Sequence, residues 1–168
     1  GDLRTLCIAL ASQMVSLVKD IPYTQAESLV TDALDSGRAL SKMREWVSAQ
    51  GGDVQHIDDT SKFATAPAYP VLAEQDGFIT AMGCEEIGHI AVLLGAGRQK
   101  KEDMIDHAAG IILHKKTGEY VQKGEPLCTL YTHRAEVVKI ATARYIQAVT
   151  IGDSAPKTLP LIVDRIGK

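Results

Sequence analysis

Hydrophobic side chains in the first fifty residues recur every three or four positions, which is the period of an α-helix. The first stripe consists of Leu3, Leu6, Cys7, Leu10, Met14, Leu17 and Val18. Two more stripes, over residues 24–34 and 40–47, are separated by Ser36-Gly37, and the second closes at Gly51-Gly52. The pattern predicts a segment of three amphipathic helices over residues 1–52.

The pattern changes twice after these helices. Residues 53–69 show no sustained period and are expected to be a linker. From residue 70 onward, short alternating runs are interrupted by glycine turns such as Asp76-Gly77, which is typical of strands. Strands are expected within residues 71–82, 110–121, 127–132, 147–152 and 159–166, and helices over 87–94 and 137–145. Residues 70–168 therefore predict a mostly antiparallel α+β domain with flanking helices.

Composition narrows the class of protein. The 168 residues are 45% hydrophobic, enough for a packed core, and the net charge of −3 argues against a nucleic-acid partner. The three cysteines form no CxxC pair, which argues against a disulfide framework or a zinc site. No apolar run reaches membrane-spanning length, so we expect a cytoplasmic protein. The chain opens with Gly1-Asp2 and no methionine, which suggests either a fragment of a longer protein or the product of tag cleavage.

Residues Gly95 to Arg98 read Gly-Ala-Gly-Arg and precede two lysines, residue types that phosphate-binding loops use. Such loops bind phosphate at the start of a helix, where free backbone N–H groups point at the ligand. Here the apolar stripe from Ile87 to Leu94 precedes the glycines, so they meet the negative end of a helix dipole. We therefore expect a helix C-terminus and an exposed turn, and we disfavour a self-standing nucleotide-binding protein.

The spacing of Gly118, Val121, Gly124 and Leu127 is similar to that of biotinyl and lipoyl carrier domains, in which glycine turns fold short strands into a flattened barrel. In those carriers a lysine in a Thr-Asp-Lys-Ala-like run is acylated. The corresponding run at residues 132–135 is Thr-His-Arg-Ala, and arginine cannot form that amide because its guanidinium stays protonated. The pattern predicts a barrel-sandwich-like (biotinyl/lipoyl-like) scaffold, and a carrier or binding module lacking its attachment lysine remains the alternative function.

The remaining residues that could bind a metal or act as acids and bases show no spacing that indicates a site. The five histidines contain no HxH or HxxxH pair and so suggest no metal site. They are His56, His89, His107, His114 and His133. Asp103 and Asp106 could do acid–base work, but no site for an electrophile lies near them in the sequence. We assign no catalytic, cofactor-binding or metal-binding residue.

A long run between residues 94 and 127 resembles the C-terminal region of the pyrimidine nucleoside phosphorylases, the family that includes thymidine phosphorylase. The family run resembles LGAGR-x-x-KED-x-ID-x-x-x-GI-x-L-x-KK-x-G-x-x-V-x-KGE-x-L. The chain matches it at Leu94 to Arg98, Lys101 to Asp103, Ile105-Asp106, Gly110-Ile111, Leu113, Lys115-Lys116, Gly118, Val121, Lys123 to Glu125 and Leu127. Residues 2–4 and 36–53 resemble the helices that precede this region, so the resemblance covers essentially the whole chain.

The resemblance implies reversible phosphorolysis of pyrimidine nucleosides, with phosphate as co-substrate and a structural potassium ion. The family's phosphate loop resembles Lys-His-Ser-Thr-Gly-Gly and lies upstream, as do the pyrimidine-binding residues and the potassium ligands. None of these motifs occurs in the 168 residues. We therefore expect a noncatalytic fragment of the larger α/β lobe, inactive by itself.

The resemblance also implies partners. The upstream phosphate- and pyrimidine-binding regions are the expected partner, with no nucleic acid and no membrane. Because the family's domains close on each other during the reaction, we hypothesise that Arg98 approaches the closing cleft. The three helices would face strands supplied from upstream, so the isolated chain is expected to form homo-oligomers or to exchange helices.

Overall fold

The computed structural model describes residues 1–157 and 160–166. These residues form two compact units, one of Gly1–Lys62 together with 160–166, and the other running from Phe63 to residue 157. The division at Phe63 lies inside the expected linker, residues 53–69. That segment is partly helical, since it contains α4 (Gln55–Asp58) and the 3-10 turn η1 (Thr60–Lys62). The last described residues group with the N-terminal helices, whereas the sequence suggested a domain over residues 70–168.

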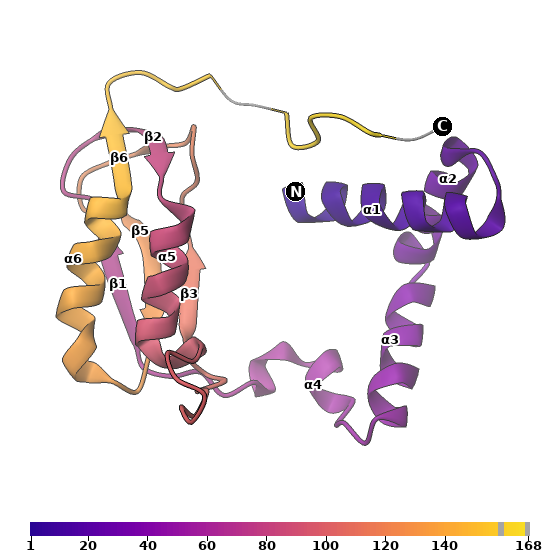
Figure 1. Ribbon diagram of the computed structural model, residues 1–168, viewed down its shortest axis with the longest axis horizontal. Helices are drawn as coiled ribbons and strands as arrows, with labels where there is room; N and C mark the ends of the chain where they lie inside the picture. Colours follow the sequence, from indigo (N-terminus) through magenta and orange to yellow (C-terminus); the bar gives the residue numbers. More distant parts are fainter. Residues whose placement is uncertain (158–159, 167–168) are drawn as a thin grey trace. The chain divides into compact units, whose positions relative to one another are not determined.

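The first unit, which we call the helical unit, contains the three predicted helices. They are α1 (Asp2–Lys19), α2 (Tyr23–Asp35) and α3 (Arg38–Ala49). Helices α1 and α2 pack against each other, and α3 makes its main helix contact with α2 (Figure 1). Of the apolar side chains described in this unit, Ile8 and Ala26 are buried. In the described part of the chain, no helix is long and apolar enough to cross a membrane.

The C-terminal segment belongs to this helical unit. Residues 161–166 lie beside the α1 residues from Leu6 to Gln13. The Arg165 guanidinium stacks 3.7 Å from the centroid of the Tyr23 ring and donates a hydrogen bond to its hydroxyl at 2.7 Å. The strand predicted over residues 159–166 is wrong for 160–166, which form no strand because they pack beside helices rather than along a sheet edge. Leu159 lies outside the described residues.

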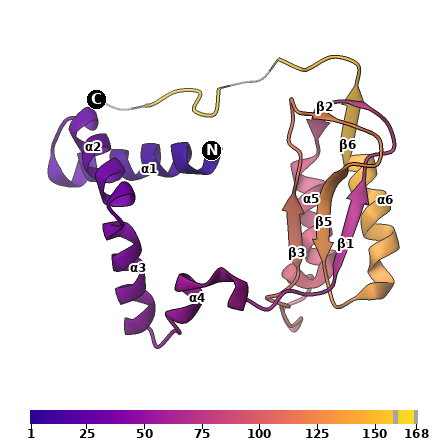
Figure 2. The same ribbon diagram turned by 180° about the vertical axis from the view of Figure 1, so that it is seen from behind.

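The second unit, which we call the sheet unit, holds two antiparallel three-stranded sheets. The first has the order β1 (Ala68–Leu72), β5 (Pro126–Tyr131), β3 (Gly110–Leu113). The second has the order β4 (Tyr120–Val121), β2 (Gly77–Met82), β6 (Val149–Gly152). Helices α5 (Cys84–Ala91) and α6 (Val138–Ala148) lie side by side on one side of the strands (Figures 1 and 2).

The predicted α+β class with antiparallel pairing is confirmed, but the barrel-sandwich-like part of the prediction is not. The described strands form two separate sheets rather than a closed barrel. The chain enters a helix after β2, and after β5 it continues through a 3-10 turn into another helix. Strands β1 and β2, consecutive in the sequence, do not form a hairpin, because β1 pairs with β5 and β2 pairs with β4 and β6.

Side chains from both sheets and both helices build one core in the sheet unit. Its largest fully buried members include Ile79, Ile90, Leu94 and Tyr145. Alternation along the first half of β2 explains why Ile79 points inward, since every second residue of a strand faces the same side. In β5, Cys128 and Leu130 follow the same alternation, and the adjacent Leu127 is buried as well. Burial raises the pKa of the Cys128 thiol to about 12, so this thiol stays protonated at neutral pH.

Removing part of this core should destabilise the protein. Ile79 is fully buried, so Ile79→Ala is expected to lower the free energy of unfolding of the sheet unit by about 2–5 kcal/mol. Chemical denaturation followed by circular dichroism measures the change. Met104→Ala is the matched control, because that side chain is 83% exposed and its loss should have little effect. Equal effects of the two substitutions would contradict this account of the core.

Candidate functional site

The Gly-Ala-Gly-Arg run lies at the end of a helix, as the sequence predicts. Helix α5 continues into a π-helical turn, η2 (Val92–Ala96), before the chain turns away. Gly95 has a φ of 112°, a left-handed conformation that favours glycine. A side chain there would also contact Asp106 and the Arg134 guanidinium at about 3.5 Å. The glycines therefore serve the geometry of a helix C-terminus, which presents carbonyl oxygens rather than N–H groups.

Three residues that lie further along the chain supply polar hydrogens to those carbonyl oxygens. The buried Thr132 hydroxyl donates to the Leu94 oxygen at 2.7 Å, and the backbone N–H of Asp106 donates to the Gly95 oxygen at 2.9 Å. The Arg134 guanidinium lies 3.5 Å from the Leu93 oxygen. We call this cluster the helix-end junction. It ties the end of α5 to the turn that follows β5.

The loop that follows the junction is held by its own carboxylate. Asp103 accepts hydrogen bonds from the backbone N–H groups of Gln99 and Lys100 at 3.0 and 2.9 Å. Those N–H groups are therefore not available to an anion, while the Arg98 side chain is exposed. The sequence analysis considered Asp103 only as a candidate for acid–base work, and it missed this structural role.

His133 and Asp106, which the sequence analysis did not predict to be neighbours, contact each other beside this loop. His133 Nδ1 lies 2.8 Å from an Asp106 carboxylate oxygen, and the other oxygen of Asp106 accepts the Ala108 N–H at 3.0 Å. The hydrogen bond from His133, followed by that from Ala108, holds the pKa of Asp106 below its ordinary value. The neighbouring Thr132 hydroxyl is buried and bonded to Leu94, so it cannot serve this histidine as a nucleophile.

Arg134, at the position that corresponds to the lysine of carrier domains, contacts the end of the preceding helix. Arg134 follows β5 and precedes the 3-10 turn η3 (Ala135–Val137) and helix α6, so it does not lie at the tip of a hairpin. Its side chain lies against Gly95 and the Leu93 oxygen. The contacts of Arg134 therefore do not support a carrier function.

The remaining candidate residues make local contacts. His114 bonds to the Thr129 hydroxyl at 2.7 Å, while His56 and His89 lie near Asp53 and Glu86. Glu86 also pairs with Arg144 of α6 at 2.5 Å, which lowers the pKa of this carboxyl group. Among the residues that the structure describes, no three histidine, cysteine, aspartate or glutamate side chains gather as they would around a metal ion.

Breaking the helix-end junction should loosen the loop. Thr132→Val keeps the side-chain volume but leaves the Leu94 carbonyl and the Arg134 N–H without their partner, so we expect a loss of about 1–3 kcal/mol in unfolding free energy. Trypsin should also cleave faster after Arg98, Lys100 and Lys101, as measured by mass spectrometry of the peptides. Thr150→Val, at an exposed position, is the control. Unchanged stability and cleavage in Thr132→Val would refute the role of the junction.

Comparison with known protein families gives a match that lies within the sheet unit. Residues 78–152 match the family profile described as the pyrimidine nucleoside phosphorylase C-terminal domain. This match spans β2 to β6 and includes the helix-end junction.

Similarity to curated proteins extends over the helices as well. A pyrimidine-nucleoside phosphorylase of Bacillus subtilis is 40% identical over 96% of this chain and 38% of its own length. One of Geobacillus stearothermophilus is 36% identical over 98% of the chain and 38% of its own length. One of Staphylococcus epidermidis is 42% identical over 81% of the chain and 32% of its own length. The chain thus spans less than two fifths of the length of these relatives. It is similar to pyrimidine-nucleoside phosphorylases along most of its own length, and residues 78–152 match the C-terminal domain of that family.

Proposed function

We propose that this chain is the C-terminal part of a pyrimidine nucleoside phosphorylase. The longer enzyme would transfer the sugar of a pyrimidine nucleoside to phosphate. A phosphate oxygen forms the new bond to the anomeric carbon, the bond from that carbon to the base nitrogen breaks, and the products are the free base and a (deoxy)ribose 1-phosphate. The observation that carries this proposal is the similarity to such enzymes along nearly the whole chain.

The chain itself would have a structural role in that enzyme. The polar side chains of the helix-end junction are engaged with backbone groups and with one another, which supports a part in shaping the fold rather than in the reaction. The phosphate co-substrate, the pyrimidine and the potassium ion that the resemblance implies would bind to preceding segments of the enzyme. The expected partner is therefore the rest of the same protein.

An activity assay tests the proposal. The purified chain should release no uracil or thymine from nucleoside and phosphate. A chimera, in which this chain replaces the matching 38% of the Bacillus subtilis relative, should release base only when phosphate is present. High-performance liquid chromatography of the products measures both reactions. Turnover by the chain alone would show that it carries its own active site, and an inactive but folded chimera would count against the proposed activity.

Arg98 offers a second test in the same chimera. It is exposed on a loop that Asp103 and the helix-end junction hold in shape, which suits a contact made when domains close. Arg98→Ala is expected to lower kcat/KM about tenfold, a loss of roughly 1.4 kcal/mol in transition-state stabilisation. The control is Lys123→Ala, another exposed cation of the sheet unit. Unchanged kinetics in Arg98→Ala would end this hypothesis.

A further inference from the structure

The C-terminal segment of residues 160–166 lies beside α1 but buries little apolar surface there. A groove of about 300 Å³ remains between the segment and the helix. The α1 residues that line this groove are Leu6, Ala9, Leu10 and Gln13. Val163 is 79% exposed and Ile166 is 100% exposed, so these two side chains contribute little to the packing. Apolar burial therefore holds the segment only weakly.

Arg165 makes the specific contacts between the segment and the helices. Its guanidinium lies 3.7 Å from the centroid of the Tyr23 ring and donates a hydrogen bond to the Tyr23 hydroxyl at 2.7 Å. The same hydroxyl donates to a carboxylate oxygen of Glu27 at 3.4 Å, so it accepts one hydrogen bond and donates another. The face of the ring and the hydroxyl oxygen thus attract the same cation.

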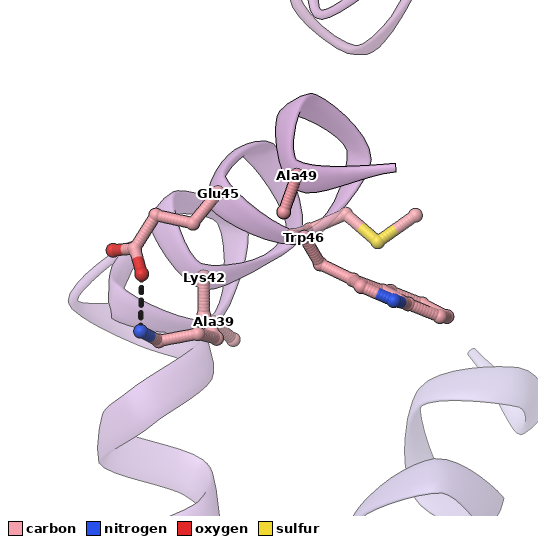
Figure 3. A pocket seen from close by; sticks show the side chains of 6 residues that line it. Ala39, Lys42, Glu45, Trp46 and Ala49 are labelled. Atoms are coloured by element: carbon pink, nitrogen blue, oxygen red, sulfur yellow. Dashed lines mark hydrogen bonds and ion pairs between the residues drawn. The ribbon is translucent and has the colours of Figure 1, made fainter. Parts of the chain in front are cut away.

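Helix α3 offers an apolar face that the segment does not use. In α3, all of whose residues the structure describes, no side chain is buried. Its groove of about 570 Å³ is lined by residues of α3 alone. Figure 3 shows Trp46 projecting to one side of the helix, while the ion pair of Lys42 and Glu45 lies on the other. An exposed apolar face by itself therefore does not determine where the segment binds, which points to the contact with Tyr23.

The position of the segment in the sequence gives this contact a wider effect. The chain leaves the helical unit after Lys62, forms the sheet unit, and returns to the helical unit with residues 160–166. Ordering a segment near the end of a chain costs backbone entropy, and a contact must outweigh that cost. Because the apolar burial is small, the contact of Arg165 with Tyr23 supplies the specific part of the balance.

We propose that residues 160–166 form a latch, which the contact of Arg165 with Tyr23 holds closed. The closed latch gives the sheet unit a second connection to the helical unit, in addition to the covalent link at Lys62-Phe63. When Arg165 leaves Tyr23, the latch detaches, the α1 groove opens to water, and the covalent link is the connection that remains. This proposal does not depend on the proposed function.

Nuclear magnetic resonance of the whole chain tests the latch. In the unsubstituted chain, the backbone order parameters of residues 161–165 should be near the value of about 0.85 that marks rigid backbone, and in Arg165→Gln they should fall below about 0.6. The ring of Tyr23 should also shift the Arg165 methylene protons upfield in the unsubstituted chain. Because Arg165 is exposed, its replacement should leave the rest of the chain folded.

Further variants separate this contact from a general loosening of the helical unit. Tyr23→Leu should release the latch as Arg165→Gln does. Tyr23→Phe and Arg165→Lys should have intermediate effects, since the first keeps the face of the ring and the second keeps the charge. Arg44→Gln is the matched control, because it removes a different exposed ion pair of the same unit, that with Asp58, and should leave the latch closed.

Relaxation of the sheet unit tests the second connection. In Arg165→Gln, the ratio of the transverse to the longitudinal ¹⁵N relaxation rate should fall for residues of the sheet unit, because a unit with one connection tumbles more independently. An unchanged ratio after release of the latch would overturn this part of the proposal. Order that persists in both Arg165→Gln and Tyr23→Leu, mobility of residues 161–165 in the unsubstituted chain, or equal release in Arg44→Gln would each refute the latch itself.

Discussion

The hydrogen bond from the buried Thr132 hydroxyl to the Leu94 carbonyl is the interaction on which the shape of the sheet unit depends. A helix that ends inside a domain leaves carbonyl oxygens that need partners, and a buried oxygen without one is costly. Thr132 lies just after β5, so satisfying this oxygen fixes the end of α5 against the central strand of a sheet. Arg134 and Asp106 then complete the same helix end from two further segments, and the loop with Arg98 takes its shape from them.

The sheet unit has a buried core, whereas the helical unit buries few of its apolar side chains. The sheet unit buries side chains from two sheets and two helices in one cluster. The helical unit has the right amphipathic pattern but, among its described residues, buries little beyond Ile8 and Ala26. The sequence pattern specifies these helices, but the packing inside the described unit contributes little to their stability.

The sequence predicted the elements better than their partners. The helical stripes and the glycine-separated strands were recognisable because they depend on neighbours within a few residues. The barrel-sandwich-like arrangement was not confirmed, and the strand predicted over 159–166 is wrong for residues 160–166. Strand pairing is decided by distant segments, which periodicity within a short window does not report. The polarity of the Gly95 turn was predictable, since the helix preceding it was visible. The contact of His133 with Asp106 was not, because the two lie 27 residues apart in the sequence.

The packing of residues 161–166 beside α1, with Arg165 on Tyr23, makes the helical unit discontinuous along the chain. The whole sheet unit is translated between its first and last parts. On a ribosome, α1 and α2 emerge before the sheet unit and must wait for residues 161–166 before this contact can form. Completion of the helical unit therefore follows synthesis of the sheet unit, even though most of the helical unit is synthesised first.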